Sequence, residues 1–385
     1  MKKSDILIHT ILFAAVTLVS FLAQSRTLDL QANLGLFLLT PDYFRETFSA
    51  PLPITHLLAS FLTQFYDIPF AGELICAALI TCIYLCLDAV LRRCGLPFHR
   101  VVSLACACAA WWLSAHAEDN TLVTGIALGC IIAALLSRLL KDREAAEVKL
   151  PEVAAVAVIL AATCAFLLTD RQIRKEERLA AVQIDARHHR WDAVLRTATV
   201  DNSLQDPRLI PFAALALGEK GALLEEMRLY PINRAEDFDF EGENSQVGSF
   251  YNSLLSECLG SPNEALHHIF QFSCHRPHTL SHVSLYQMIK YNIEKGDITL
   301  ARKYAEVLRR SPRNAATAAK MLRLYPESAP SDTLYRANPS SRVVTNNPVY
   351  NLALYRQEGL VSKHLTDRFG YYMLLQEDTD EDALD

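Results

Sequence analysis

The sequence predicts an all-α protein in which about five transmembrane helices precede a domain of helical repeats. Two observations predict this class. Hydrophobic stretches separated by short charged connectors fill the chain up to Thr169, whereas amphipathic patterns with charged faces follow Asp170. In the second part, a Gly-containing turn recurs after 36 residues, at Gly260 and Gly296. The predicted parts are a transmembrane domain (1–169), a repeat domain (170–326), and a connector with a final helical stretch and an acidic tail (327–385).

The composition excludes several classes of protein. The 385 residues carry a formal net charge of -6, and Lys and Arg are scattered, so the chain lacks the basic footprint of a nucleic-acid-binding protein. Eight of the ten cysteines lie in or beside hydrophobic stretches, where Cys behaves as a small hydrophobic residue. No two cysteines form a CxxC pair, which argues against zinc ribbons and thioredoxin-like chemistry. No cofactor is predicted.

Five hydrophobic stretches have roughly the length of a membrane span. The first follows Lys2 and Lys3 and resembles a signal peptide, but it is too long and a cut after Ala23 would place the bulky Phe21 at position -3, so we expect no cleavage. The third stretch is short and could form a half-membrane hairpin with the fourth. The predicted spans are 6–23, 70–91, 101–115, 121–136 and 153–169.

The connectors predict the orientation of these spans. Lys and Arg gather at the amino terminus, at 92–100 and at 138–149, whereas the loop containing Glu118 and Asp119 has none. The positive-inside rule then places the amino terminus in the cytoplasm, and five spans place the carboxy-terminal domain outside. Near the cytoplasmic end of the second span, Asp88 precedes Arg92 by one helical turn, which favours an interfacial ion pair.

The first external loop, at 24–69, is too apolar for a solvated linker. Its segments 34–39 and 54–66 are expected to lie on or in the bilayer surface, interrupted by several prolines. Asp42-Tyr43-Phe44, Pro51, the run LLASFLTQFY at 57–66 and Pro69 resemble the first-loop segment of GT-C-type membrane glycosyltransferases. The resemblance implies that an acidic residue of this loop acts as a base or a metal ligand, and the matching candidates are Asp29, Asp42 and Glu46.

The same order of segments is similar to a family of uncharacterised bacterial multi-spanning proteins that have a helical-repeat tail. In the soluble half, Gly260 and Gly296 are each followed five residues later by Ala, at Ala265 and Ala301. This pattern resembles the tetratricopeptide repeat (TPR), in which Gly ends the first helix and the small Ala allows the two helices to approach closely. Weaker copies at 189–192 and 219–221 favour an α-solenoid of roughly four helix pairs.

One cluster in the soluble half contains metal-ligating residue types. Cys274, His275, His278 and His282 fall within nine residues, and His278 and His282 would share one face of a helix. The spacing fits no established zinc pattern, and solvated or turn-capping histidines are the alternative. Cys274 and Cys258 are predicted to be buried and unpaired, because the intervening helix would place the thiols about 18 Å apart.

Two functions remain open at this point. The first is an integral membrane protein of the bacterial cytoplasmic membrane that displays an extracytoplasmic TPR-like domain for protein or peptide binding. The alternative is a GT-C-like glycosyltransferase that uses a lipid-linked sugar, with its site in the first external loop. The lipid bilayer is an expected partner in both cases, and nucleic acid in neither.

Overall fold

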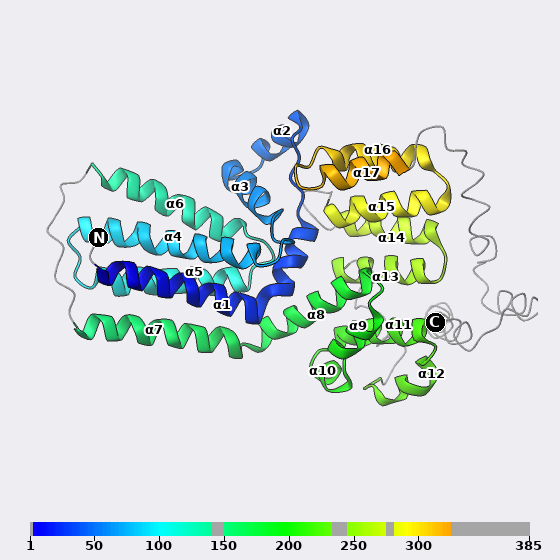
Figure 1. The fold of residues 1–385 in the computed structure, drawn as a ribbon, viewed down its shortest axis with the longest axis horizontal. Coiled ribbons are helices and arrows are strands. Elements are labelled where there is room, and N and C mark those ends of the chain that lie inside the picture. Colours follow the sequence, from blue (N-terminus) through cyan, green and yellow to red (C-terminus); the bar gives the residue numbers. More distant parts are fainter. Residues whose placement is uncertain (1–2, 140–149, 233–244, 275–280, 325–385) are drawn as a thin grey trace, which may run out of the picture. The chain divides into compact units, whose positions relative to one another are not determined.

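The computed structural model describes residues 3–139, 150–232, 245–274 and 281–324, and every regular element in these ranges is a helix (Figure 1). This confirms the all-α prediction for the described part of the chain. Contacts divide the chain into two compact units, Met1–Glu177 and Arg178–Asp385. The boundary falls within a single helix, α8 (Arg171–Arg187).

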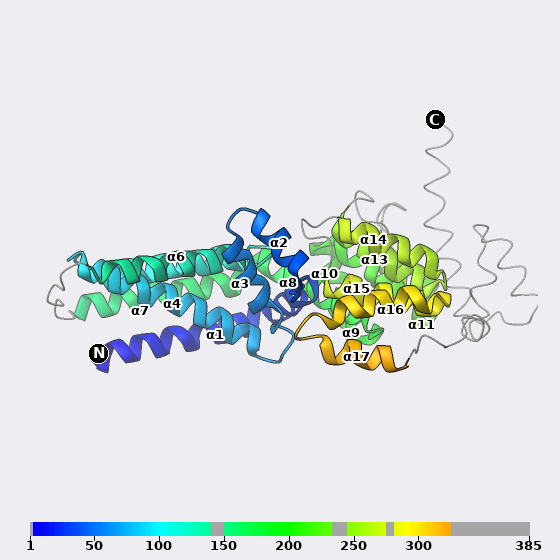
Figure 2. The same ribbon diagram turned by 90° about the horizontal axis from the view of Figure 1, so that it is seen from above.

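The first unit is a bundle of hydrophobic helices with two short helices in its first loop. Its helices before α8 are α1 (Lys3–Leu34), α2 (Pro41–Ser49), α3 (Pro53–Thr63), α4 (Ala71–Arg93), α5 (His99–Ala115), α6 (Thr121–Ser137) and α7 (Leu150–Thr169). Figures 1 and 2 show α1, α4, α6 and α7 running side by side along the length of the bundle. α4 packs against α1, α5 and α6, and α7 packs against α5 and α1.

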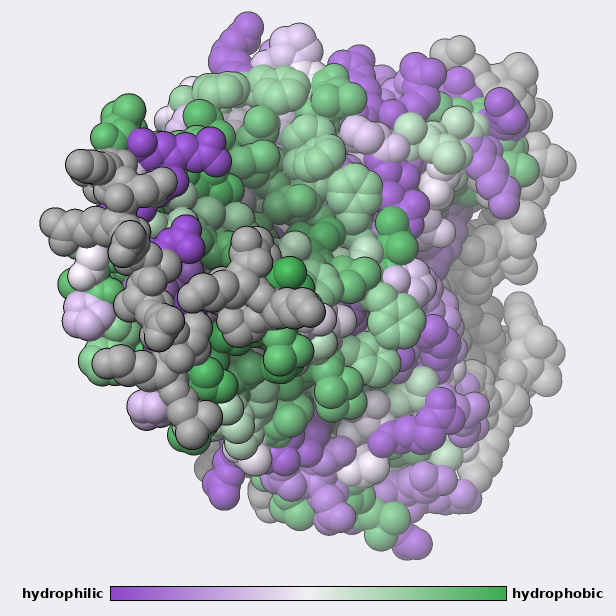
Figure 3. Space-filling view, turned by 60° about the vertical axis from the view of Figure 1, so that its left-hand side comes forward, coloured by the Kyte–Doolittle hydropathy of each residue, from purple (hydrophilic) through white to green (hydrophobic). Residues whose placement is uncertain are grey.

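The core of this bundle draws side chains from each long helix. Leu12 of α1, Ile80 of α4, Trp111 of α5, Val123 of α6 and Leu160 of α7 belong to one buried cluster. The outward-facing side chains are hydrophobic as well, and Figure 3 shows this apolar surface in green. A bundle that is apolar inside and outside is typical of a protein embedded in lipid.

Three helices of the described chain are long and apolar enough to cross a membrane. They lie at Ile6–Leu34, Ala71–Arg93 and Pro151–Thr169. α5 and α6 have 17 residues each, so each is about 26 Å long, slightly less than the roughly 30 Å hydrocarbon core. The structure therefore supports three spans by length and composition, where the sequence predicts five.

The first loop begins later than predicted, because α1 continues as a helix to Leu34 instead of ending near Ala23. The carboxylate of Glu177 accepts the backbone amides of Arg26 (2.7 Å) and Thr27 (2.9 Å). The Glu177 carboxylate binds these amides as a capping side chain binds the free amides at the start of a helix. A side chain that inserts among the backbone hydrogen bonds of a helix bends the helix. Figure 1 shows the last turns of α1 leaving the axis of the preceding part.

α3 covers most of the apolar segment 54–66 and packs on α6. The contact is close at Gly125 of α6, where an added Cβ would lie 3.1 Å from Cγ2 of Thr55. Only a residue without a side chain permits this approach without a shift of α3. The first loop is therefore attached to the bundle through α3.

The second unit continues α8 with a series of shorter helices. They are α9 (Trp191–Thr197), α10 (Val200–Gln205), α11 (Ile210–Lys220), α12 (Leu223–Glu226), α13 (Gln246–Cys258), α14 (Pro262–Cys274), α15 (His282–Lys295), α16 (Ile298–Arg309) and α17 (Ala315–Leu324), with 3-10 turns at Pro207–Leu209 and Met227–Leu229. From α13 to α17, each helix packs mainly against the next one along the chain. The contacts of this part are therefore local in sequence.

One turn geometry joins four helix pairs of the second unit. Its central residue has a positive φ at His189 (53°), Gly221 (70°), Gly260 (77°) and Gly296 (89°), at intervals of 32, 39 and 36 residues. At each turn the following amide donates to the carbonyl five residues back: Arg190 to Asp185, Ala222 to Leu217, Ser261 to Ser256 and Asp297 to Asn292, over 2.8–2.9 Å. This is the Schellman helix ending, which satisfies the last carbonyls of the first helix.

The Gly and Ala positions of the predicted turns are confirmed. Gly260 and Gly296 adopt the left-handed conformation, and Ala265 and Ala301 are buried. The predicted connector, final helical stretch and tail at 327–385 lie outside the described residues.

Two Gly to Ala substitutions should change stability in opposite directions. Gly296→Ala should lower the free energy of unfolding by about 1 kcal/mol, because an L side chain is strained at this φ. Gly218→Ala should raise it by about 0.5 kcal/mol, because Gly218 lies inside α11 with no atom within 4 Å of an added Cβ. Urea unfolding of the detergent-solubilised protein measures both changes. If both variants destabilise the protein, the space around Gly218 is not large enough for a Cβ, contrary to the structure.

Candidate functional site

The three carboxylates suggested by the first-loop resemblance occupy different environments. Asp42 and Glu46 lie on α2 and are exposed, and Asp42 pairs with Arg45 at 3.5 Å. Asp29 lies in α1 and is half-buried, and its Oδ1 accepts a hydrogen bond from the Asn33 amide at 3.1 Å. Two of these candidates therefore face solvent, and the third is engaged by its own helix.

The acidic residue that the structure buries near this loop is Glu73, which the sequence reasoning missed. It lies in the first turn of α4 and is 5% exposed. The amino terminus of a helix favours a carboxylate. Next to it along the chain, Gly72 packs against Tyr66, and the Tyr66 hydroxyl accepts the Asn120 amide at 2.5 Å. This end of the bundle therefore has a polar interior beneath an apolar surface.

The opposite end of the bundle holds an aspartate–histidine hydrogen bond and a buried ion pair. Asp88 contacts His99 at 2.6 Å, across the turn from α4 to α5, so the predicted partner Arg92 is replaced by a histidine. Arg100 and Glu152 lie 3.5 Å apart and are both buried. Lipid cannot solvate a charge, so intramembrane ionic groups turn inward and pair. These contacts fasten α5 to α4 and α7.

The Cys and His cluster is only partly described. His275 and His278 lie outside the described residues. Cys274 ends α14 and is exposed, whereas we expected it to be buried, because the last turn of α14 presents it to solvent. His282 begins α15, and its ring lies against Tyr286. Among the described residues, no group of three His, Cys, Asp or Glu side chains could hold a metal ion.

A polar network around Glu257 joins three helix pairs of the second unit. The Glu257 side chain, on the last turn of α13, is only 8% exposed. Its oxygens accept hydrogen bonds from His189 Nε2 (2.9 Å), Tyr291 Oη (2.8 Å) and the ammonium of Lys290. His189 belongs to the turn after α8, and the other two donors belong to α15. Segments about 70 and 30 residues away therefore meet at one carboxylate.

The donors determine the charge state of this carboxylate. Burial alone would raise the pKa of Glu257, but the hydrogen bonds from His189, Lys290 and Tyr291, with the charge of Lys290, lower it below the ordinary 4.5. Burial and the neighbouring negative charge raise the pKa of Tyr291 well above 10, so Tyr291 remains a donor. The network is thus built around an ionised Glu257.

His189 is the exception among the four turn residues, because the other three are glycine. A histidine at φ 53° is strained by about 1 kcal/mol. Its imidazole reaches Glu257 and packs edge-on against Trp191 at 5.3 Å between ring centroids. A glycine at this turn would remove the strain and also the contact with Glu257.

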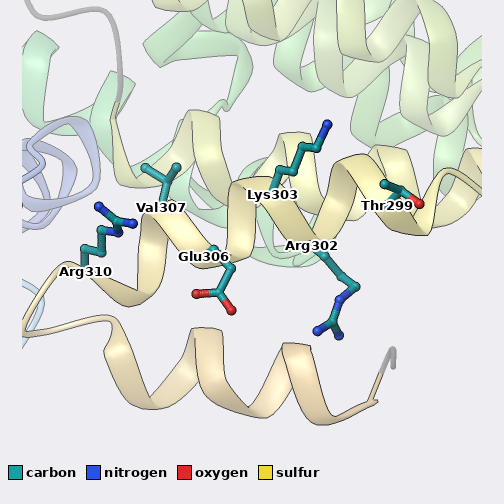
Figure 4. Close-up of a pocket in the computed structure, with 6 residues that line it drawn as sticks. All are labelled: Thr299, Arg302, Lys303, Glu306, Val307 and Arg310. Atoms are coloured by element: carbon teal, nitrogen blue, oxygen red, sulfur yellow. The ribbon is translucent and has the colours of Figure 1, made fainter. Parts of the chain in front are cut away.

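A hollow runs along one face of α16 in the same unit (Figure 4). It has a volume of about 440 Å³ and is lined by Thr299, Arg302, Lys303, Glu306, Val307 and Arg310. The spacing of these residues by three and four defines a single stripe of the helix. Arg302 extends from this stripe to donate to the Leu322 carbonyl of α17 at 3.0 Å. The hollow therefore combines three cationic side chains with Glu306, Thr299 and the apolar Val307.

These features define a class: an all-helical protein with apolar helices of membrane-spanning length and a second helical unit. The particular family follows from the sequence. A model of a family of unknown function, DUF6057, matches residues 2–169 and 147–347, so the chain belongs to that family. No curated protein and no solved structure matches the chain. The expected membership of an uncharacterised family is confirmed, and the TPR and GT-C resemblances stay predictions.

The Glu257 network should make the stability of the second unit dependent on pH. A carboxylate with a lower pKa when folded stabilises the fold fully above its ordinary pKa of 4.5, and this contribution is lost as the pH falls through the folded-state value. Glu257→Gln should remove this dependence and lower the free energy of unfolding by about 3 kcal/mol at pH 7, because Lys290 loses its buried partner. Urea unfolding between pH 3 and pH 7 measures both effects.

Asp192→Asn is the matched control for this variant. Asp192 forms an ion pair with Lys220 at 2.5 Å, but both side chains are largely exposed. Its removal should leave the unfolding midpoint at pH 7 unchanged. Equal losses from the two variants would show that burial of Glu257 does not matter.

Proposed function

We propose that this protein is an integral protein of the bacterial cytoplasmic membrane that displays its second unit outside the membrane as a TPR-like α-solenoid for binding a protein or peptide. The single observation that carries the proposal is the turn shared by four helix pairs at near-repeat spacing. Repeats of this kind bury their apolar faces on one another and leave continuous surfaces for ligands.

The hollow on α16 supports a peptide as the kind of ligand. It follows one stripe of α16, as the docking face for an extended or helical segment does. Its exposed Lys303 and Arg310 favour acidic side chains, and Val307 offers an apolar contact between them. An acidic peptide segment with one hydrophobic residue matches this chemistry.

The proposed topology has five spans, with α5 and α6 also crossing, each packed against α4. Both helices are slightly short for the hydrocarbon core, but snorkelling side chains and local thinning accommodate such a mismatch at small cost. The amino terminus is then cytoplasmic and the second unit extracytoplasmic.

A reporter fused at two positions tests this topology. Alkaline phosphatase, which is active only in the periplasm, should be active after Asp385 and inactive within the connector at 141–149, because five spans separate the amino terminus from the second unit. β-Galactosidase at the same positions is the control and should give the reverse pattern. Phosphatase activity at 141–149 alone would overturn both the orientation and the span count.

In-cell photo-cross-linking tests the binding function and separates it from the glycosyltransferase alternative. A benzoylphenylalanine at Val307 should give one discrete protein adduct, and Lys303→Glu with Arg310→Glu should reduce its yield at least about tenfold, because charge reversal repels an acidic ligand. The same probe at Leu204, an exposed residue of α10, is the positional control and should give no such adduct.

The alternative function predicts a different sensitivity. A GT-C-like enzyme would depend on a first-loop carboxylate, so Asp29→Asn, Asp42→Asn and Glu46→Gln are introduced one at a time into the chain that carries the probe. The binding proposal expects the adduct to survive each substitution. If the adduct also survives reversal of Lys303 and Arg310, and one carboxylate variant fails to complement a deletion strain at normal protein level, the enzyme replaces the binding protein as the better account.

A further inference from the structure

The strongest charge asymmetry of the second unit lies at the end of its described part. Residues 298–324, which form α16, the following turn and α17, contain seven Lys and Arg residues and one acidic residue, Glu306. The exposed cations are Lys303, Arg309, Arg310, Arg313, Lys320 and Arg323. In the described residues from Arg178 to Asp297, acidic residues slightly outnumber basic ones. Among the described residues of the second unit, the excess of basic over acidic residues is therefore confined to one region, here called the α16–α17 basic face.

The only acidic residue of this face is already neutralised. Glu306 pairs with Arg309 at 2.8 Å, within one turn of α16. The other exposed cations add up along the hollow and the adjoining helix, so the face carries a positive potential in a chain whose net charge is -6. A ligand of opposite charge is the chemistry that this face recognises.

The same chain ends in a segment of that charge. Residues 377–385 contain six acidic residues and no Lys or Arg. They also contain one large hydrophobic residue, Leu384. The α16–α17 basic face has six exposed cations, of which Arg309 already pairs with Glu306, and the segment has six acidic residues of opposite charge.

We propose that residues 377–385 bind the α16–α17 basic face of the same molecule. This inference goes beyond the proposed binding of a partner, because it names the chain's own terminus as the ligand of the hollow. A partner with an acidic segment would then have to displace an internal competitor.

The chain length permits this contact. The described part ends at Leu324 on α17 itself, and 52 residues separate it from Glu377. Even at the rise of about 1.5 Å per residue of a helix, 52 residues can span about 78 Å, several times the length of α16. Tethering at this range gives an effective concentration on the order of 1 mM, so even weak charge pairing leads to binding within one molecule. Such pairing is strongly weakened by salt, because the Debye length falls to about 3 Å at 1 M.

Photo-cross-linking of the purified full-length protein in neutral lipid nanodiscs tests the proposal. A benzoylphenylalanine at Leu384 should form an intramolecular link, and mass spectrometry should place it within residues 298–324. The yield should fall at least about fivefold at 1 M salt. It should fall as far in a chain whose six acidic residues at 377–385 are replaced by Asn and Gln, and in one with Lys303→Glu and Arg310→Glu.

The matched control reverses two exposed cations elsewhere in the second unit, with Arg196→Glu and Arg228→Glu. It has the same change in net charge and should leave the yield unchanged, and near-ultraviolet circular dichroism checks that each variant is folded. Links that map outside 298–324, or a yield that is insensitive to salt and to the reversal of Lys303 and Arg310, would overturn the proposal. Because the purified protein contains no partner, the result is independent of the adduct expected from Val307 in cells.

Discussion

Glu257 places a negative charge on the last turn of α13, where the carbonyl dipoles of the helix already make the potential negative. Such a charge is unfavourable in isolation and more so when it is buried. It is maintained because a histidine, a lysine and a tyrosine from two other helix pairs donate to it. The carboxylate therefore fixes how α13 meets α15 and the turn after α8, since any other register would leave it without its donors. The apolar contacts of these helices tolerate small shifts, whereas this network does not.

Directional polar contacts also fix the helices at the two ends of the first unit. Between them the bundle is held by packing of apolar side chains, which specifies position only loosely in lipid. At one end Asp88 meets His99 and Arg100 meets Glu152, and at the other Asn120 meets Tyr66. These contacts are directional and lie where the short helices α5 and α6 begin or end. They define the rotation of each helix about its axis, which an apolar surface alone leaves open.

Hydrophobic runs and glycine positions were sufficient to predict the helical class, the long first-unit helices and the turns at Gly260 and Gly296. The continuation of α1 to Leu34 was not predictable, because the capping carboxylate lies 150 residues away in sequence. Likewise, Asp88 has a cation one turn along its own helix, and nothing local indicates that it contacts His99 instead.

The candidate site also has one part that the sequence reveals and another part that it does not. The basic stripe of α16 can be found from residue spacing alone, since it lies on one helix. The Glu257 network could not, because a Glu in an amphipathic helix usually faces water and its donors come from distant segments. One feature of the sequence points to Glu73. It lies at the start of an apolar run that follows Pro69, and the amino terminus of a helix accommodates a carboxylate.

The capping of α1 by Glu177 constrains the order in which the chain assembles. During synthesis the amides of Arg26 and Thr27 emerge long before Glu177 does, and the intervening residues must be inserted first. The bend of α1 therefore acquires its final form only after α7 has entered the bilayer. The helices from α13 to α17 pack mainly between neighbours along the chain, so their pairing needs no distant segment. Assembly of the first unit thus depends on its last helix, whereas these helices of the second unit assemble through local contacts.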